Sequence, residues 1–312
     1  MTSRFASALI VLCAVMWSTT GTAAALQGDG VSPSVIGAVT LGGGGLLMCA
    51  VFGRRAVLAL RTRGATGWII AGGLAIATYA PAFYTSMSWT SVAVGTALNI
   101  GTAPLFAAVL ERVLEARPLH LRWGCGIVVA FSGLGCLLFF DEPRGNASSA
   151  SDILLGSAFG VVAGFLFAFY TVASRRALQR HGDARGVMAA MFGSAGIFLT
   201  PVIVVSGAPL LESPTSFALV TYQVLVPGLA AWLLFGVALQ HITGRTATTL
   251  TLLEPVAAAA WASLLVGQHL TGLGWVGMAV VVAGVALATV PYTRRRAAVV
   301  TPTDEELPVR PT

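Results

Sequence analysis

The chain consists of long apolar runs that are separated by short polar segments. Each run is about 20 residues long, the length of a helix that crosses the hydrocarbon core of a bilayer. Hydrocarbon offers no partner for backbone N–H and C=O groups, so runs of this length must be helices, whereas barrel strands would be shorter and would alternate polar with apolar residues. The pattern predicts ten transmembrane helices, at residues 6–26, 33–52, 67–88, 91–110, 121–140, 153–174, 186–206, 216–240, 246–267 and 271–291.

Three segments define the organisation of the chain around these runs. The run 6–26 could be mistaken for a secretory signal, but no clear cleavage site follows it before the next run, so it is taken as the first helix. The polar segment 141–152 is predicted to be an external linker between two halves of the chain. The segment 292–312 combines proline and charge without periodicity, which predicts a disordered cytoplasmic tail.

Composition excludes a water-soluble fold. Hydrophobic residues make up 56% of the chain and charged residues 10%, against about 25% charged residues in an average soluble domain. The formal net charge is +6, but all 18 basic residues are arginines that lie in short clusters between the apolar runs. Such clusters are typical of topology signals and not of a nucleic-acid surface. We therefore predict a multi-pass protein of the plasma membrane whose partners are lipid and a small molecule, with no nucleic acid.

The arginines also predict the orientation of the chain. Ten crossings place both termini on the same side of the membrane. If that side is the cytoplasm, every arginine except Arg144 lies on the cytoplasmic side, as the excess of basic residues in cytoplasmic loops requires. Both termini are therefore predicted to be cytoplasmic.

The two halves of the chain, 5–140 and 153–291, share a pattern that indicates an internal repeat. Five crossings in each half mean that the second half enters the membrane from the opposite side, so the two five-helix repeats are predicted to be inverted. Inverted repeats enclose a substrate site near the middle of the membrane and alternate its access by rocking against each other. An offset of 151 residues superimposes Pro104 on Pro255, Leu119 on Leu270, Gly126 on Gly277 and Gly133 on Gly284.

The stretches GTALNIGTAPLFAAVLE (95–111) and TLTLLEPVAAAAWASLLVGQHLTGLGWVGMAVVVAGVAL (249–287) resemble the EamA-type carriers of the drug/metabolite transporter superfamily. The resemblance covers residues 5–290. It implies an all-α integral membrane fold of ten helices in two inverted repeats. It also implies a secondary carrier without a bound cofactor, commonly an exporter of amino acids or other small metabolites.

One feature of the chain departs from that family. Family members often carry a glutamate in a Leu-Gly-Glu string at the end of the fourth and of the ninth helix. The corresponding residues here are Leu114-Glu115-Ala116-Arg117 and Leu265-Val266-Gly267-Gln268. A role that depends on the second of these acids is therefore not expected in this chain.

Glu254 is the candidate for substrate binding or coupling. It is the only acidic residue well inside an apolar run, where an ionisable side chain costs about 2.5–3.5 kcal/mol to insert. Pro255 follows it and removes one backbone donor, which loosens the helix and leaves carbonyl groups beside the acid. The pair could hold a cationic amine or a proton. The alternative is a protonated side chain that hydrogen-bonds a neighbouring helix and fixes its packing.

Further candidates lie in the apolar runs. Asn99 could hydrogen-bond a substrate or join two helices. Pro104 and Pro255 are predicted to act as helix hinges. Rings with hydroxyl or indole donors suit flat or amphipathic substrates, although such rings are also ordinary packing groups. In EamA-type carriers the corresponding helices face the central cavity. The aromatic candidates are Trp17, Tyr79, Tyr84, Tyr170 and Trp232.

Three functions remain open on this basis. The first is a secondary exporter driven by a substrate gradient or by proton antiport, with Glu254 as the candidate for coupling or for cation binding. The second is a broad-specificity drug or osmolyte carrier that depends on the aromatic residues. The third is a membrane enzyme or a scaffold, which is disfavoured because the sequence contains no HExxH, no GxSxG, no metal-ligand cluster and no nucleotide-binding loop. The four cysteines show no CxxC spacing and are predicted to be buried small apolar residues, not metal ligands or disulfide partners. A homo-oligomer is compatible with the sequence.

Overall fold

The structure is a computed structural model, which describes residues 2–27, 32–90, 92–116, 118–139, 150–265 and 272–289. Most of the predicted linker 141–152, the whole of the predicted tail 292–312 and the string that ends at Gln268 lie outside the described residues. Their predicted roles therefore stay predictions.

All regular secondary structure in the described part of the chain is helical, and helix occupies each of the ten ranges that the apolar pattern predicts. Six of the ranges hold α1 (Ser3–Leu26), α4 (Thr66–Trp89), α5 (Val92–Glu115), α6 (Leu121–Phe139), α7 (Ala150–His181) and α8 (Ala184–Ser206). A seventh range holds α13 (Gly272–Thr289), which is the last described helix. A short 3-10 turn, η2 (Ala208–Leu211), follows α8.

The other three ranges hold helices that change their winding part-way. The first contains α2 (Pro33–Ala38), a π-helical turn η1 (Val39–Gly43) and α3 (Gly44–Arg61). The second contains α9 (Pro214–Leu225), a π-helical turn η3 (Val226–Ala230) and α10 (Ala231–Leu239). The third contains α11 (Gly244–Leu250), a 3-10 turn η4 (Thr251–Leu253) and α12 (Glu254–Leu265). Neither π-helical turn was predicted from the sequence.

The lengths and surfaces of the helices are those of a membrane protein. Seven helical stretches of the described residues are long and apolar enough to cross a bilayer. Large apolar side chains such as Leu154, Val204 and Val205 are mostly exposed on the outside of the bundle. Cys125 and Cys136 are exposed as well, so the prediction that the cysteines are buried is wrong for these two. An apolar exterior is unfavourable in water and is the expected surface in lipid. The seven stretches are Ser3–Thr20, Ser34–Arg61, Thr66–Trp89, Ser151–His181, Ala184–Ser206, Pro214–Leu239 and Gly272–Thr289.

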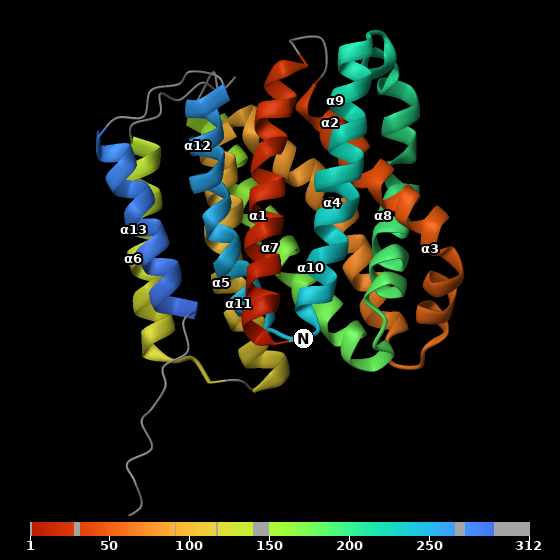
Figure 1. Cartoon of the computed structure of the whole chain (residues 1–312), viewed down its shortest axis with the longest axis horizontal. Coiled ribbons are helices and arrows are strands. Elements are labelled where there is room, and N and C mark those ends of the chain that lie inside the picture. The colour runs from red at the N-terminus through yellow and green to blue at the C-terminus, as the bar shows by residue number, and fades with distance from the viewer. Residues whose placement is uncertain are drawn as a thin grey trace, which may run out of the picture.

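The helices form an elongated bundle (Figure 1). The pair α6 and α13 stands at one end of its long axis and the pair α3 and α8 at the other, with α1 and α7 between them (Figure 1). Helix α7 packs against both α4 and α5, so it forms the centre of the core. Around it lie fully buried side chains, among them Tyr170, Phe192 and Phe235.

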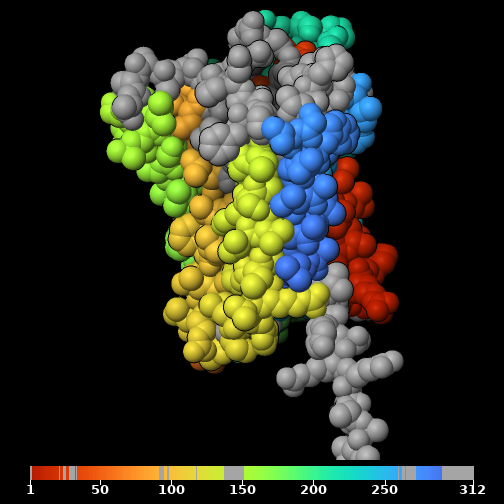
Figure 2. Space-filling view, turned by 90° about the vertical axis from the view of Figure 1, so that its left-hand side faces the viewer, coloured from red at the N-terminus to blue at the C-terminus, as the bar shows by residue number. Residues whose placement is uncertain are grey.

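Helices α6 and α13 lie side by side along one face of the molecule (Figure 2). Glycines on both helices permit their backbones to touch, as small residues do at membrane helix interfaces. A Cβ atom at Gly133 would lie 2.6 Å from the nitrogen of Val281 and 2.7 Å from the oxygen of Gly277. A Cβ atom at Gly284 would meet the backbone of α6, 2.7 Å from the oxygen of Gly126.

This contact predicts that a methyl group added to α6 lowers the stability of the protein only where it faces α13. Gly133→Ala should lower the stability of the protein by about 1–3 kcal/mol, because the backbone of α13 must move away from the new atom. Gly135→Ala is the matched control, since a Cβ atom at Gly135 meets nothing within 4 Å. Thermal unfolding in detergent micelles measures both variants. Equal midpoints for the two would contradict the close packing of α6 and α13.

Candidate substrate cavity

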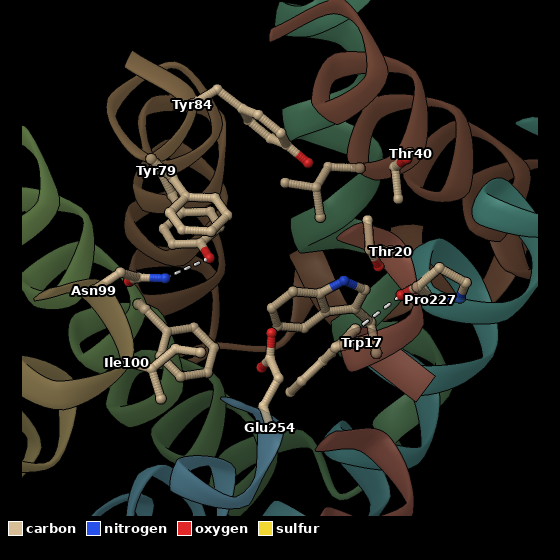
Figure 3. Close-up of a pocket in the computed structure, with 13 residues that line it drawn as sticks. Trp17, Thr20, Thr40, Tyr79, Tyr84, Asn99, Ile100, Pro227 and Glu254 are labelled. Carbon is tan, nitrogen blue, oxygen red and sulfur yellow. Dashed lines mark hydrogen bonds between the residues drawn. The ribbon is translucent and has the colours of Figure 1, made fainter. Parts of the chain in front are cut away.

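A cavity of about 80 Å³ lies inside the bundle. A single water molecule needs about 10–15 Å³ on the same scale, so the cavity holds several waters or a small organic molecule. Figure 3 shows that its walls come from both halves of the chain, with Tyr79, Tyr84 and Asn99 opposite Trp17, Pro227 and Glu254. The lining residues are Trp17, Thr20, Thr40, Leu41, Tyr79, Phe83, Tyr84, Asn99, Ile100, Phe167, Pro227, Trp232 and Glu254.

Glu254 is the only charged residue in this lining. It is the first residue of α12 and directly follows the 3-10 turn η4, and its own N–H is bonded to the carbonyl of Thr251. Pro255 then takes a position in the first turn of α12, where the missing N–H of a proline costs little. The side chain of Glu254 points into the cavity (Figure 3). Within the part of the chain that the structure describes, no hydrogen bond or ion pair of its carboxyl group is found.

All three changes of helical winding border the cavity. Thr40 lies in the π-helical turn η1, Pro227 lies in the π-helical turn η3, and Glu254 follows η4. Such turns leave backbone groups displaced from the regular ladder, and π-helical turns are frequent at functional sites. The displaced carbonyl of Pro227 accepts a hydrogen bond from the indole nitrogen of Trp17 at 3.2 Å. These turns therefore position side chains at the cavity wall and also supply backbone acceptors there.

Aromatic rings form most of the wall. The ring centroids of Trp17 and Trp232 lie 4.4 Å apart, and that of Phe167 lies 6.3 Å from Trp17 and 6.0 Å from Trp232. On the other side, the rings of Tyr79 and Phe83 are stacked at 5.5 Å. Tyr84 contacts Phe83 edge to face at 5.3 Å. The cavity is thus lined by aromatic rings from α1, α4, α7 and α10.

Two amides supply polar atoms at the edge of the cavity. The side-chain nitrogen of Asn99 donates a hydrogen bond to the Tyr79 hydroxyl at 3.0 Å, as Figure 3 shows. Asn99 is only 2% exposed, and its Oδ1 atom has no hydrogen-bond partner within the described residues. Gln223 lies behind the lining, and its Oε1 atom accepts from the Thr40 hydroxyl at 3.2 Å. An unpaired buried acceptor is costly, but Oδ1 of Asn99 is covered by neighbouring atoms, so a ligand would gain a hydrogen bond to it only if those atoms moved.

The structure brings six of the seven predicted binding residues together in this lining. Tyr170 is the exception, because its ring is fully buried beside Phe192 and Trp232 and its hydroxyl donates to the sulfur of Met188 at 3.3 Å. Pro104 lies buried within α5 and does not line the cavity. The functional roles of these residues, and the hinge roles of Pro104 and Pro255, remain predictions.

Other lining residues were not predicted from the sequence. Phe83 is one helical turn from Tyr79 and Phe167 is one turn from Tyr170, so helical spacing from a predicted aromatic residue could have identified both. Thr20, Thr40, Leu41, Ile100 and Pro227 carry no such signal, because threonine, leucine, isoleucine and proline are ordinary residues of apolar helices. Only the tertiary packing selects them.

Ion pairs close one end of the bundle. Arg175 of α7 lies 3.1 Å from the carboxylate of Glu115 on α5, and Arg176 lies 3.8 Å from it. The backbone N–H of Arg245 on α11 donates to Glu111 at 2.9 Å, and its guanidinium group lies 3.9 Å from the same carboxylate. Glu111 follows Ile100, the last lining residue on α5, by 11 residues, so about 16 Å of helix separates it from the cavity, and about 22 Å separates Glu115 from it.

Comparison with known proteins identifies the family. The model of the EamA-like transporter family matches the chain twice, at residues 4–139 and 154–290. The chain belongs to the EamA-like transporter family. The resemblance stated from the sequence is thereby confirmed, and a membrane transporter is the class of protein that the matches support.

Individual relatives agree with this assignment. The chain is 29% identical over 305 residues to the uncharacterized transporter YwfM of Bacillus subtilis. This alignment covers 96% of this chain and 98% of the relative. It is 28% identical over 216 residues to the threonine/homoserine exporter RhtA of Salmonella typhimurium, over 68% of this chain and 67% of the relative. A solved crystal structure shares the fold, with a TM-score of 0.75 at 20% identity over 93% of this chain and 97% of the other.

The burial of these ion pairs predicts that two substitutions, each of which neutralises one acid, lower the stability of the folded protein by different amounts. Glu111→Gln should destabilise the folded protein by about 3 kcal/mol, because loss of one partner leaves a buried charge uncompensated. The side chains of Glu111 and Arg245 are 1% and 12% exposed.

Asp183→Asn is the control for this prediction. It breaks a pair with Arg55 whose side chains are 31% and 50% exposed, and an exposed pair contributes under about 1 kcal/mol. Asparagine also preserves the cap that Asp183 provides to α8. Thermal unfolding in detergent compares the two variants. A larger loss for Asp183→Asn would contradict the assignment of Glu111 as the buried partner.

Proposed function

We propose that the protein is a secondary active transporter that moves a small metabolite, an amino acid or a related amine, by alternating access. The observation that carries the proposal is the Glu254 carboxyl group on the wall of an internal aromatic cavity, without a protein partner among the described residues. An ionisable side chain at this depth in a membrane is unfavourable unless it binds a proton or a cation. Competition of substrate and proton for one carboxyl group couples their movements in opposite directions.

Two inverted five-helix repeats are the architecture that we infer for this mechanism. The two separate matches of the family model, one to each half of the chain, support a repeat. The packing supports it too, because α6 pairs with α13 and α3 pairs with α8, as equivalent helices of two halves would. Likewise α7 packs on α4 and α5, while α1, its equivalent, packs on α10 and α12.

The ion pairs at the arginine-rich end of the bundle support a mechanism in which the cavity opens to one side of the membrane at a time. The ion pairs of Glu111 and Glu115 join α5 to α11 and α7 beyond the cavity. We infer that this arginine-rich end faces the cytoplasm, in the plasma membrane, with both termini on the same side. Rocking of one half against the other would break these pairs and give the cavity access to the cytoplasm. Export is the inferred direction, since one relative is a threonine/homoserine exporter.

The broad-specificity carrier stays as the second candidate because of the aromatic wall. Six of the thirteen lining residues carry aromatic rings, and rings accommodate many flat or amphipathic molecules without fixed hydrogen bonds. Such a carrier would bind through ring surfaces and depend little on Glu254.

Transport in reconstituted vesicles under an imposed pH gradient tests the proposed function. Amines and amino acids represent the proposed substrates, and a fluorescent cationic dye represents the broad-specificity carrier. We expect Glu254→Gln to reduce proton-driven transport to the level of protein-free vesicles, because the neutral amide cannot exchange a proton.

Glu212→Gln is the matched control for this experiment. It removes one carboxyl group from an exposed position outside the cavity and should leave transport unchanged. Dye transport that is undiminished in Glu254→Gln would favour the broad-specificity carrier. The absence of transport for all compounds would refute the proposed function.

Labelling of single cysteines tests the inferred orientation. In a background in which Cys13, Cys49, Cys125 and Cys136 are replaced, Glu212→Cys should react with a membrane-impermeant thiol reagent in intact cells. Arg63→Cys, at the arginine-rich end, should react only after the cells are opened. Both positions are exposed. The reverse labelling pattern would overturn the assignment of the arginine-rich end to the cytoplasm.

A further inference from the structure

The charge of the cavity lining is unbalanced. Glu254 is its one ionisable carboxylate, and the lining contains no arginine and no histidine. The chain has no lysine at all, and its described arginines lie near helix ends or in connecting segments. A ligand with one positive charge would neutralise this cavity. A ligand with an additional negative charge would bring that charge into an apolar enclosure without a counter-charge.

The aromatic rings in the lining also favour a ligand with a positive charge. The lining that Glu254 enters also contains the rings of Trp17, Tyr79, Phe83, Phe167 and Trp232. The face of an aromatic ring is electronegative and attracts cations within about 6 Å of its centre, most strongly for tryptophan. Glu254 and the rings would therefore stabilise the same cationic group.

The unpaired amide oxygen of Asn99 requires a donor. Its Oδ1 atom is buried without a partner within the described residues, while its Nδ2 atom is engaged by the Tyr79 hydroxyl. An ammonium group carries up to three N–H donors and no acceptor. It could bond to the carboxylate of Glu254 and, once the atoms that cover Oδ1 move on binding, to Asn99 as well, whereas a carboxylate group on the ligand would face two acceptors.

The backbone offers no compensating site for an anion near Glu254. Helix N-termini commonly bind carboxylates through free N–H groups. At the start of α12, however, the N–H of Glu254 already donates to the carbonyl of Thr251, and Pro255 has no N–H. The donors that remain in the lining of the described residues are neutral, namely hydroxyl groups such as those of Thr20 and Tyr84 and the indole N–H of Trp232.

We propose that the substrate is an organic monocation, an amine that carries no carboxylate, rather than a zwitterionic amino acid. This inference rests on the proposed function for its biological meaning and narrows it to one substrate class. The ammonium group lies between Glu254 and the aromatic rings, and Asn99 accepts one of its N–H groups. The remainder of the molecule packs against the apolar part of the wall.

Binding to the purified full-length protein tests the substrate class with two matched pairs of compounds. Threoninol and phenylalaninol differ from threonine and phenylalanine only by the replacement of the carboxylate with a neutral hydroxymethyl group. Titration calorimetry measures affinity, and the change in total tryptophan fluorescence, to which Trp17 and Trp232 of the lining contribute, follows occupancy of the cavity. We expect at least one amino alcohol to bind about 30-fold or more tightly than its amino acid, the ratio expected when a buried charge is left unpaired.

Binding measurements on three variants test whether Glu254 holds the ammonium group. Glu254→Gln should weaken binding of the amino alcohol about 30-fold or more while the fold is retained, as checked by thermal unfolding. Asn99→Leu should weaken binding of the amino alcohol to a smaller extent, since it removes a neutral acceptor. Glu212→Gln should bind as the unaltered protein does.

Three results would overturn the inference. They are an amino acid that binds as tightly as its amino alcohol, an amino alcohol that Glu254→Gln binds unchanged, and no binding of any of the four compounds at millimolar concentration. Tighter binding of the amino acid by Glu254→Gln would support the inference, because the charge of Glu254 would then be what excludes the carboxylate of the ligand.

Counterflow of the same compounds in vesicles separates this inference from the proposed function. Amino alcohols that bind through Glu254 without being transported would support the substrate class and refute the transport mechanism. Amino acids that are transported while amino alcohols are excluded would support transport and refute the substrate class.

Discussion

The fold is governed by the need to bond every backbone N–H and C=O group within the protein, because hydrocarbon provides no alternative. Helices satisfy this need, and the described structure is helical throughout its regular segments. The winding changes at η1, η3 and η4, and each of these turns borders the cavity. Irregular backbone is tolerated in a membrane where it lines an internal space. The regular winding of these helices therefore changes beside the cavity.

The same constraint explains how the bundle holds together. Lipid is as apolar as leucine, so membrane helices gain little from burying large apolar side chains against each other. Close backbone contact, such as that of Gly133 and Gly284 between α6 and α13, replaces that driving force with packing. At one end of the bundle, charged residues on α5, α7 and α11 provide the remaining connections. One end is thus joined by ion pairs that are reversible, while the α6–α13 pair is held by steric fit.

The cavity then combines features that a membrane interior normally excludes. Glu254 is an acid without a protein counter-charge in the described residues, and Asn99 keeps an unpaired acceptor. Both would destabilise a permanently closed core. A binding site in a carrier tolerates them because a proton, a substrate or water occupies it in each state. The structural cost of these residues is consistent with their use in binding.

The sequence by itself determined the class of fold and the positions of the ten helical segments, and it singled out Glu254 as a candidate, because all three follow from the cost of placing polar groups in hydrocarbon. It also indicated Trp17, Tyr79, Tyr84, Asn99 and Trp232, since polar and aromatic side chains inside apolar runs are conspicuous. Only the tertiary structure separated these from Tyr170, which points into packed core, and added Thr40 and Pro227, which reach the cavity through π-helical turns. The rotation of each helix about its own axis decides which side chains meet. Apolar runs with little amphipathic character leave that rotation undefined until the helices pack.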